Sequence, residues 1–254
     1  MGYERRKMPF ARRFVIDSMI VGESKHVIHG LLEVDVTTAR ERIARSERDL
    51  SFSAYVVACL ARSIAAHPIV HAYRSLRGDL VIFDDVDVCV IVETERSQHS
   101  SPIPVVLRGA ESRTVADLTD EIRRAQRSAR PMGRSRFRLA GYLPGSVRRA
   151  VMRLAMKNPS VLKKQAGTAA VTSVGMFGNS PGYGIAHATV HTLGLVVGSI
   201  TRHHVLGENG RTVARERLQL TVSVDHDIVD GGPAARFTAD LVAALESGDL
   251  LRPT

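Results

Sequence analysis

The sequence lacks tryptophan, and it contains few aromatic residues and only two cysteines. Aromatic residues make up 5% of the 254 positions. No zinc-finger, recognition-helix or base-stacking motif accompanies the basic charge, which argues against nucleic-acid binding. Cys59 and Cys89 lie far apart in the chain without a Cys-x-x-Cys spacing. This arrangement excludes a disulfide framework or a cysteine-based zinc cluster and predicts two buried free thiols.

Long apolar runs are also absent. No stretch approaches the roughly 18 apolar residues that a membrane span needs. The first residues, Met-Gly-Tyr-Glu-Arg-Arg-Lys, are not followed by an apolar segment with a small-residue cleavage site. The charged fraction of 24% and the mean hydropathy of -0.03 are typical of a globular protein with a substantial core. We therefore expect a cytoplasmic protein with one large domain.

The charge that is present is strongly basic. The net charge of +9 comes from 35 arginines and lysines, of which only five are lysines. Such a surface attracts phosphates on nucleic acid, on anionic lipid or on a nucleotide tail such as that of coenzyme A. The sequence predicts a basic N-terminal arm over residues 1–13, followed by one domain over residues 14–254.

Hydrophobic periodicity and turn residues predict the order of the secondary-structure elements. Strands are expected from about Phe14 and over His26–Val36, Leu80–Phe83, Val86–Val92, Ile103–Leu107, Thr168–Val174, Thr192–Ile200 and Leu218–Asp225. Helices are expected from Thr37 or Thr38 to Ser46, from Ser51 or Ser53 to just before Pro68, and over Val115–Arg127, Ser146–Lys157 and Pro233–Leu245. This order is not the regular alternation of a doubly wound sheet. It favours a mixed sheet with helices on one face.

A basic insertion interrupts this order at about residues 128–165. It is rich in arginine, lysine, glycine and proline, and it contains one predicted helix from Ser146 to Lys157. Val147, Ala150, Val151 and Leu154 would form one apolar face of that helix beside several basic residues. The insertion could cover the protein's own core, or it could contact an acidic membrane surface or an acidic partner.

The most informative local pattern lies at the end of the last predicted strand. Apolar residues alternate along Leu218–Val224 and place His226 at the end of an apolar stripe, with Asp230 and Gly231 in the following turn. Composition alone predicts about 0.04 occurrences of His-x-x-x-Asp-Gly in a chain of this make-up. By itself, a histidine at a strand end is more often a packed structural residue. Two further histidine pairs with i, i+4 spacing, His67/His71 and His187/His191, lack the pattern of a metalloprotease motif.

Several segments share a family resemblance in the same order along the chain. The segment D-H-D-I-V-D-G-G-P-A-A-R-F (Asp225–Phe237) resembles the D-H-R-x-x-D-G-x-x-A-A-R-F signature of the acyltransferase subunits of 2-oxo acid dehydrogenase complexes. More distantly it resembles chloramphenicol acetyltransferase. Similar segments occur at His26–Thr37, Ala65–Ala72, Pro102–Ala110 and Val171–Gly178.

The resemblance implies a fold, an assembly and a chemistry. The fold is an α/β protein of the α+β two-layer sandwich type, chloramphenicol acetyltransferase-like, assembled as homotrimers with sites between subunits. His226 would be the general base that takes a proton from an attacking thiol, and Thr172 would donate a hydrogen bond to the oxyanion. Asp230 would anchor the histidine-bearing loop, with Arg12 and Arg13 as candidate partners. Coenzyme A or acyl-CoA would be a substrate, and no metal is implied.

The sequence also departs from the family pattern. No lipoyl-lysine module precedes the core, so we expect the thiol to be coenzyme A or a dihydrolipoamide on a separate carrier. Asp227 replaces the arginine that usually follows the histidine, and the Asn-Pro-Pro element is missing near Ala188–Val190. The alternative interpretation is a non-catalytic trimeric scaffold that binds acidic partners or a membrane through its basic insertion.

Overall fold

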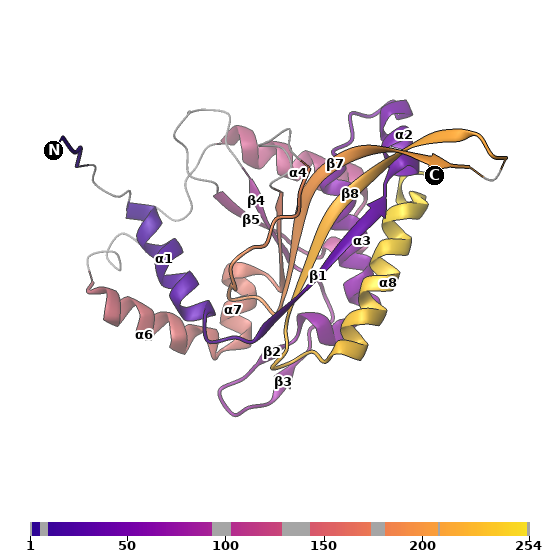
Figure 1. Cartoon of the computed structure of the whole chain (residues 1–254). Helices are drawn as coiled ribbons and strands as arrows, with labels where there is room; N and C mark the ends of the chain where they lie inside the picture. Colours follow the sequence, from indigo (N-terminus) through magenta and orange to yellow (C-terminus); the bar gives the residue numbers. More distant parts are fainter. Residues whose placement is uncertain are drawn as a thin grey trace.

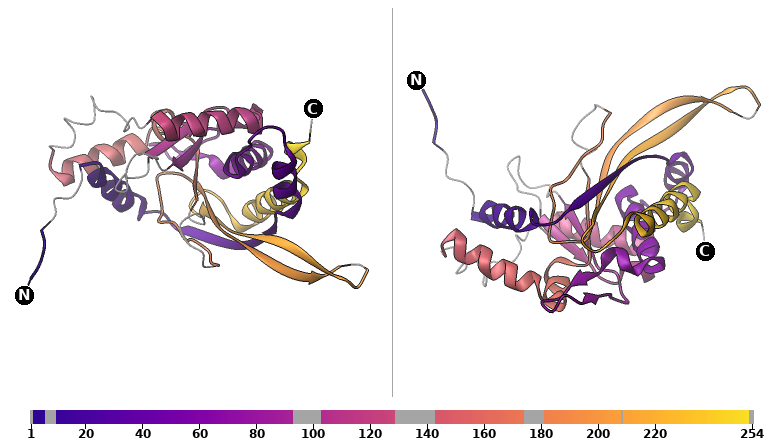
Figure 2. Two further views of the ribbon diagram at one scale, coloured as in Figure 1. Left: turned by 90° about the horizontal axis from the view of Figure 1, so that it is seen from above. Right: turned by 60° about the horizontal axis from the view of Figure 1, so that its bottom comes forward.

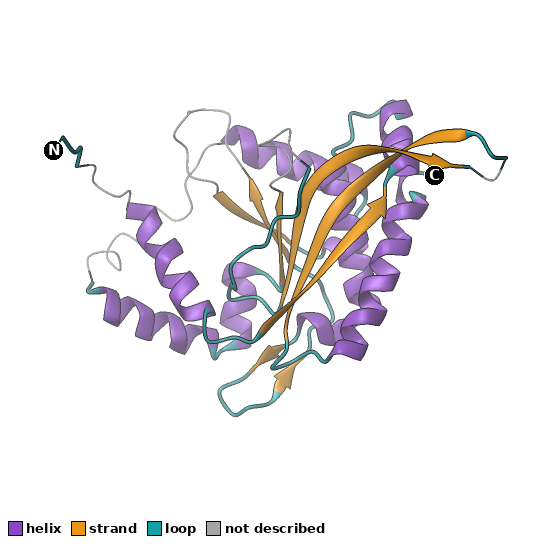
Figure 3. Ribbon diagram, in the orientation of Figure 1, coloured by secondary structure: helices purple, strands orange, loops and turns teal. Residues whose placement is uncertain are grey.

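The computed structural model describes residues 2–5, 10–92, 103–128, 143–173, 181–207 and 209–252. Its helices are α1 (Phe10–Gly22), α2 (Thr37–Arg45), α3 (Phe52–Ala66), α4 (Val115–Ser128), α6 (Gly145–Met156), α7 (Pro159–Ala166) and α8 (Gly231–Ser247), with short 3-10 turns η1 (Pro68–His71), η2 (Ala110–Ser112) and η4 (Asp249–Leu251). Its strands are β1 (Val27–Asp35), β2 (Tyr73–Arg74), β3 (Leu80–Val81), β4 (Val88–Val92), β5 (Ile103–Leu107), β6 (Ala169–Ser173), β7 (Leu193–Leu206) and β8 (Thr212–Asp225). Figures 1 and 3 show the elements in sequence order and by type.

A six-stranded mixed sheet forms the centre of the fold, in the order β1-β8-β7-β6-β4-β5. The three strands β4, β6 and β7 run parallel to one another, and the remaining pairs are antiparallel. Helices α3 and α8 lie along one face of this sheet (Figure 1). The predicted α/β architecture, a mixed sheet with helices on one face, is therefore confirmed.

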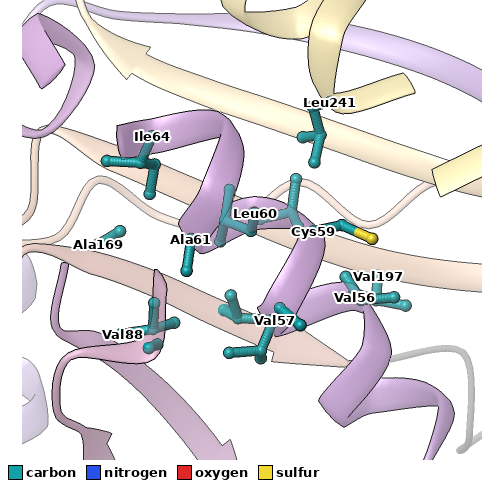
Figure 4. Close-up of a cluster of buried hydrophobic side chains, with 14 of the residues drawn as sticks. Val56, Val57, Cys59, Leu60, Ala61, Ile64, Val88, Ala169, Val197 and Leu241 are labelled. Carbon is teal, nitrogen blue, oxygen red and sulfur yellow. The ribbon is translucent and has the colours of Figure 1, made fainter. Parts of the chain in front are cut away.

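Helix α3 is the centre of the hydrophobic core. It is mostly apolar and buries ten of its residues, with Arg62 exposed, as expected for a helix that other elements cover on most sides. It lies between Leu241 of α8 and strand residues such as Val88 and Ala169 (Figure 4). Cys59 on this helix is fully buried, and Cys89 on β4 is almost so. Both are free thiols, as the sequence predicted.

The two long strands β7 and β8 extend beyond their neighbours. Pairing of β1 with β8 ends at Asp35 and Arg217, and pairing of β6 with β7 ends at Ser173 and Val197. The continuing part of β7 and β8, up to Leu206 and Thr212, is a two-stranded ribbon that projects from the sheet (Figure 1).

The first predicted strand is wrong, because the segment from Phe14 belongs to helix α1. The apolar run Phe-Val-Ile suggested a strand. The buried side chains, however, are Asp17 and Val21, four positions apart as on one face of a helix. Helix α7 also has no counterpart in the sequence prediction. Its N-terminus is capped by Asn158, whose side chain accepts a hydrogen bond from the Val161 N–H.

The basic insertion forms α6 and α7 where it is described, and residues 129–142 lie outside the described part. Helix α6 packs against α1, and the two lie side by side at the edge of the molecule away from α8 (Figures 1 and 2). In the described part of the chain, no helix is long and apolar enough to cross a membrane.

Candidate active site

His226 begins a tight turn between β8 and α8. Its side chain is exposed, and its backbone N–H donates a 2.8 Å hydrogen bond to the carbonyl oxygen of His26. The preceding residue, Asp225, is the last residue of β8 and pairs with Val27 at the start of β1. Asp225 and His226 are thereby held against the segment that leads into β1.

A buried ion pair between Lys25 and Asp225 fixes the position of this turn. Lys25 Nζ lies 3.1 Å from the Asp225 carboxylate, and the two side chains are 12% and 4% exposed. The ammonium group also donates to the carbonyl oxygens of Val190 (3.1 Å) and His191 (2.8 Å). The other Asp225 oxygen accepts a hydrogen bond from the Asp227 N–H. Lys25 therefore joins the His226 turn to the loop that precedes β7.

Burial lowers the pKa of Lys25 from its usual value, and the adjacent Asp225 carboxylate opposes that shift. A buried ion pair is stable only when its remaining donors and acceptors are satisfied. Here two carbonyls and one backbone N–H complete the arrangement. Sequence reasoning missed Lys25. The available signal was a lone lysine directly before the first core strand in a chain with only five lysines.

Asp227, which departs from the family pattern, has its own partner. His26 Nδ1 lies 2.8 Å from the Asp227 carboxylate, with side chains 82% and 29% exposed. The consecutive residues Lys25 and His26 thus pair with Asp225 and Asp227, the two residues on either side of His226. The carboxylate beside the predicted base therefore has a partner of its own.

Thr172 lies on β6, half-buried, on the sheet face opposite the helices, since its neighbours Ala169 and Val171 point into the core. It pairs with Val196 on β7, which pairs with Thr221 on β8. At about 3.3 Å per residue and 4.8 Å per strand, Thr172 and His226 are roughly 15–20 Å apart in one chain. A single chain does not bring these two predicted site residues together.

Asp230 occupies the N-cap position of α8 and is exposed. Its side chain makes no capping hydrogen bond, and no ion pair joins it to another of the described residues. Its predicted arginine partner stays a prediction. In the single chain, the buried ion pair at this turn is Lys25–Asp225.

An apolar groove of about 700 Å³ runs between β1 and α8, beginning beside the His226 turn at Gly231. Small residues keep it open, mainly Gly30 on the strand and a row of alanines on the helix, Ala234, Ala235, Ala239 and Ala243. The buried cysteines lie elsewhere and are not activated. Burial raises the pKa of Cys59 to about 12 and that of Cys89 to about 11.

Several other histidines have structural partners. His67 pairs with Asp240, and His71 contacts the carbonyl oxygen of Phe83. His191 Nε2 donates to the Ala166 carbonyl at 2.7 Å, and its Nδ1 accepts from the Thr189 hydroxyl at 3.0 Å. Burial, with Lys25 as an additional nearby charge, lowers the pKa of His191 to about 4.

The fold is similar to that of proteins of known structure. The structure superposes with a TM-score of 0.70 on a probable dihydrolipoamide acetyltransferase from Listeria monocytogenes 4b F2365, at 18% identity, covering 97% of this chain and 95% of that one. It superposes with a TM-score of 0.54 on a chloramphenicol acetyltransferase, at 12% identity, covering 95% of this chain and all of that one. The predicted chloramphenicol acetyltransferase-like fold is therefore confirmed.

The sequence comparisons find similarity to one family of acyltransferases. Residues 147–252 match the family model of the 2-oxoacid dehydrogenases acyltransferase catalytic domain. The chain is 25% identical over 228 residues to the lipoamide acyltransferase component of the branched-chain alpha-keto acid dehydrogenase complex of Bacillus subtilis (strain 168). That alignment covers 86% of this chain and 46% of the relative, so the chain spans about half of that protein's length. The resemblance to this family that the motifs indicated is therefore confirmed.

Proposed function

We propose that this protein is an acyltransferase that moves an acyl group between a thioester and a thiol, with coenzyme A or a dihydrolipoamide on a separate carrier as the thiol. The observation that carries the proposal is the exposed His226, held at a strand end between two paired aspartates. The related lipoamide acyltransferase component and the family model support this class of reaction.

The proposed chemistry is direct transfer. A thiol with a pKa near 8.5 is only about 3% thiolate at pH 7, so a base must remove its proton as sulfur attacks. His226 takes this proton while the new carbon–sulfur bond forms at the thioester carbonyl. The resulting oxyanion accepts a hydrogen bond from the Thr172 hydroxyl. The old carbon–sulfur bond then breaks, and the departing thiolate takes the proton back from His226.

The separation of Thr172 from His226 along the sheet bears directly on assembly. A hydroxyl roughly 15–20 Å from the base cannot serve the same reaction, because the attacking thiol must lie within about 3 Å of His226 and the oxyanion within about 3 Å of the Thr172 hydroxyl. We therefore place each active site between two copies of the chain, with His226 from one and Thr172 from its neighbour. A closed homotrimer provides three such sites.

The apolar groove beside the turn indicates the kind of acyl group. Its lining is mostly glycine, alanine and aliphatic residues, with His29, Thr238 and Glu246 as the polar members, and this mainly apolar surface suits an aliphatic acyl chain. Turnover of purified protein with acyl-CoA donors of increasing chain length, and dihydrolipoamide as acceptor, tests this substrate class. Loss of all turnover across the whole series would leave the non-catalytic scaffold as the better interpretation.

A complementation experiment tests the shared site. His226→Ala should lower turnover by about 10² to 10⁴-fold with an intact fold, and Thr172→Ala by about 10² to 10³-fold. Co-refolding the two inactive variants in equal amounts should restore about a quarter of wild-type turnover, because random mixing gives one interface in four with both residues. The matched control mixes His226→Ala with a variant that carries both substitutions, which should restore nothing.

If the co-refolded mixture stays inactive although light scattering shows folded trimers, the two residues do not share a site across the interface. An active monomer in dilute solution would contradict the assembly as well.

A further inference from the structure

The positive charge of this protein is concentrated in one part of the chain. Residues 122–207 contain 14 arginines and lysines and no aspartate or glutamate, whereas the rest of the chain carries 21 basic and 26 acidic residues. Helices α6 and α7 lie within this acid-free stretch. Every charged residue of these two helices is therefore basic. Acidic residues of other elements pair with some of them, Asp17 with Arg148 and Arg149 and Asp85 with Lys163.

Helix α6 presents an apolar stripe that no other described element of the chain covers. None of its residues is buried. Val147, Val151 and Leu154, at positions i, i+4 and i+7, are 43%, 59% and 65% exposed, and Ala150 is exposed between them. This spacing places the four side chains on one face of the helix. We call them the α6 stripe.

The basic residues of α6 fall into two groups. Arg148 and Arg149 turn toward α1, where they pair with the buried Asp17 at 2.6 Å and 3.4 Å. Arg153 and Lys157 are exposed instead, beside the α6 stripe. The pair with Asp17 thus fixes the helix on α1 with its apolar stripe and two cations facing outward. Figure 2 shows both helices at the margin of the fold, away from the sheet.

We propose that the α6 stripe docks on an anionic lipid surface. Its chemistry is that of an interfacial helix, in which aliphatic side chains enter the boundary between headgroups and acyl chains while flanking cations meet lipid phosphates. A second copy of this chain is a poorer occupant, because the same excess of positive charge would be brought against itself. This surface is independent of the proposed acyl transfer.

Vesicle binding tests the proposal. Because the chain has no tryptophan, the fluorescence of one introduced tryptophan reports on the surroundings of that position alone. Leu154→Trp places a single tryptophan in the α6 stripe. Leu206→Trp, at the exposed tip of the β7–β8 ribbon, is the matched control. With vesicles of phosphatidylcholine and phosphatidylglycerol, emission from position 154 should shift to the blue and emission from position 206 should not. Pure phosphatidylcholine vesicles should bind at least about tenfold more weakly.

Co-sedimentation of otherwise wild-type protein completes the test. The double variant Val151→Ser and Leu154→Ser should bind anionic vesicles about tenfold more weakly, while Leu76→Ser and Leu206→Ser, which alter equally exposed leucines elsewhere, should bind normally. Absence of vesicle binding, equal loss in both double variants, or a blue shift at position 206 would overturn the proposal. A change in oligomer mass on altering the stripe would also overturn it, because the stripe would then be a contact between copies.

Discussion

The His226 turn and the α1–α6 pair are each fixed by a buried aspartate, but their surroundings differ. Asp225 pairs with one lysine, which also donates to two backbone carbonyls. Asp17 pairs with two arginines of α6, a helix without a single buried residue. The first ion pair lies at the end of a strand whose inward side chains belong to the core, and the second joins two helices at the margin.

The difference shows what a buried ion pair contributes in each setting. Such a pair adds little net stability relative to apolar packing, but removing one partner leaves an uncompensated charge. At the His226 turn, the pair joins the end of β8 to the loop that precedes β7, so it sets the position of one backbone turn. Between α1 and α6, the pair fixes the orientation of a helix that otherwise has few restraints. Four substitutions sharpen this comparison.

Lys25→Met should have the largest effect. It leaves the Asp225 carboxylate buried without a cation, which typically costs about 3–5 kcal/mol of unfolding free energy. If the turn shifts by about 1 Å, turnover should fall about 10²-fold with little change in KM. Chemical denaturation and steady-state kinetics measure both effects. Adding Asp225→Asn should recover part of the stability, and a Lys25→Met protein with unchanged stability would contradict the role assigned to the pair.

His191→Gln should remove part of the pH dependence of the unfolding free energy. The folded state keeps His191 neutral down to about pH 4, whereas the unfolded chain protonates it near pH 6.5. The unfolded state therefore binds more protons between these values, and wild-type stability should fall by up to about 3 kcal/mol as the pH drops from 6.5 to 4. In His191→Gln this part of the slope should vanish, because glutamine can still donate to the Ala166 carbonyl without titrating. Urea unfolding at several pH values measures this change of unfolding free energy with pH. If the change were the same in His191→Gln as in wild type, groups other than His191 would be its source.

The sequence predicted the sheet, the core helices and His226 because each has a strong local signal. Alternation marks β8, continuous apolar character marks α3, and the D-H-D-I-V-D-G segment marks the turn. It missed what depends on tertiary pairing. Nothing near Lys25 in the sequence shows that it meets Asp225, 200 positions away. The apolar run in α1 suggested a strand. The helical spacing was not visible in the apolar pattern, because the residue that is buried together with Val21 is the charged Asp17.

Asp17→Asn should have a smaller and more local effect than Lys25→Met, although its carboxylate is equally buried. Since α6 buries no residue, its release can occur without global unfolding. We expect the global unfolding free energy to change by about 1 kcal/mol or less, while amide hydrogen exchange in α1 and α6 becomes at least tenfold faster. Asp49→Asn, which breaks an exposed pair with Arg123, is the control. A large global loss would show that α1 and α6 unfold together with the sheet.

His26→Ala should have the smallest effect. The His26–Asp227 pair is largely exposed, and such pairs contribute at most about 1 kcal/mol, a contribution that salt screens. The contact that holds His226 comes from the His26 carbonyl oxygen, which alanine retains. Turnover should therefore stay within about threefold of wild type, and the small stability loss should disappear in about 1 M salt, where screening acts over about 3 Å. A fall in turnover as large as that of Lys25→Met would show that the imidazole ring of His26, as well as the backbone, positions the base.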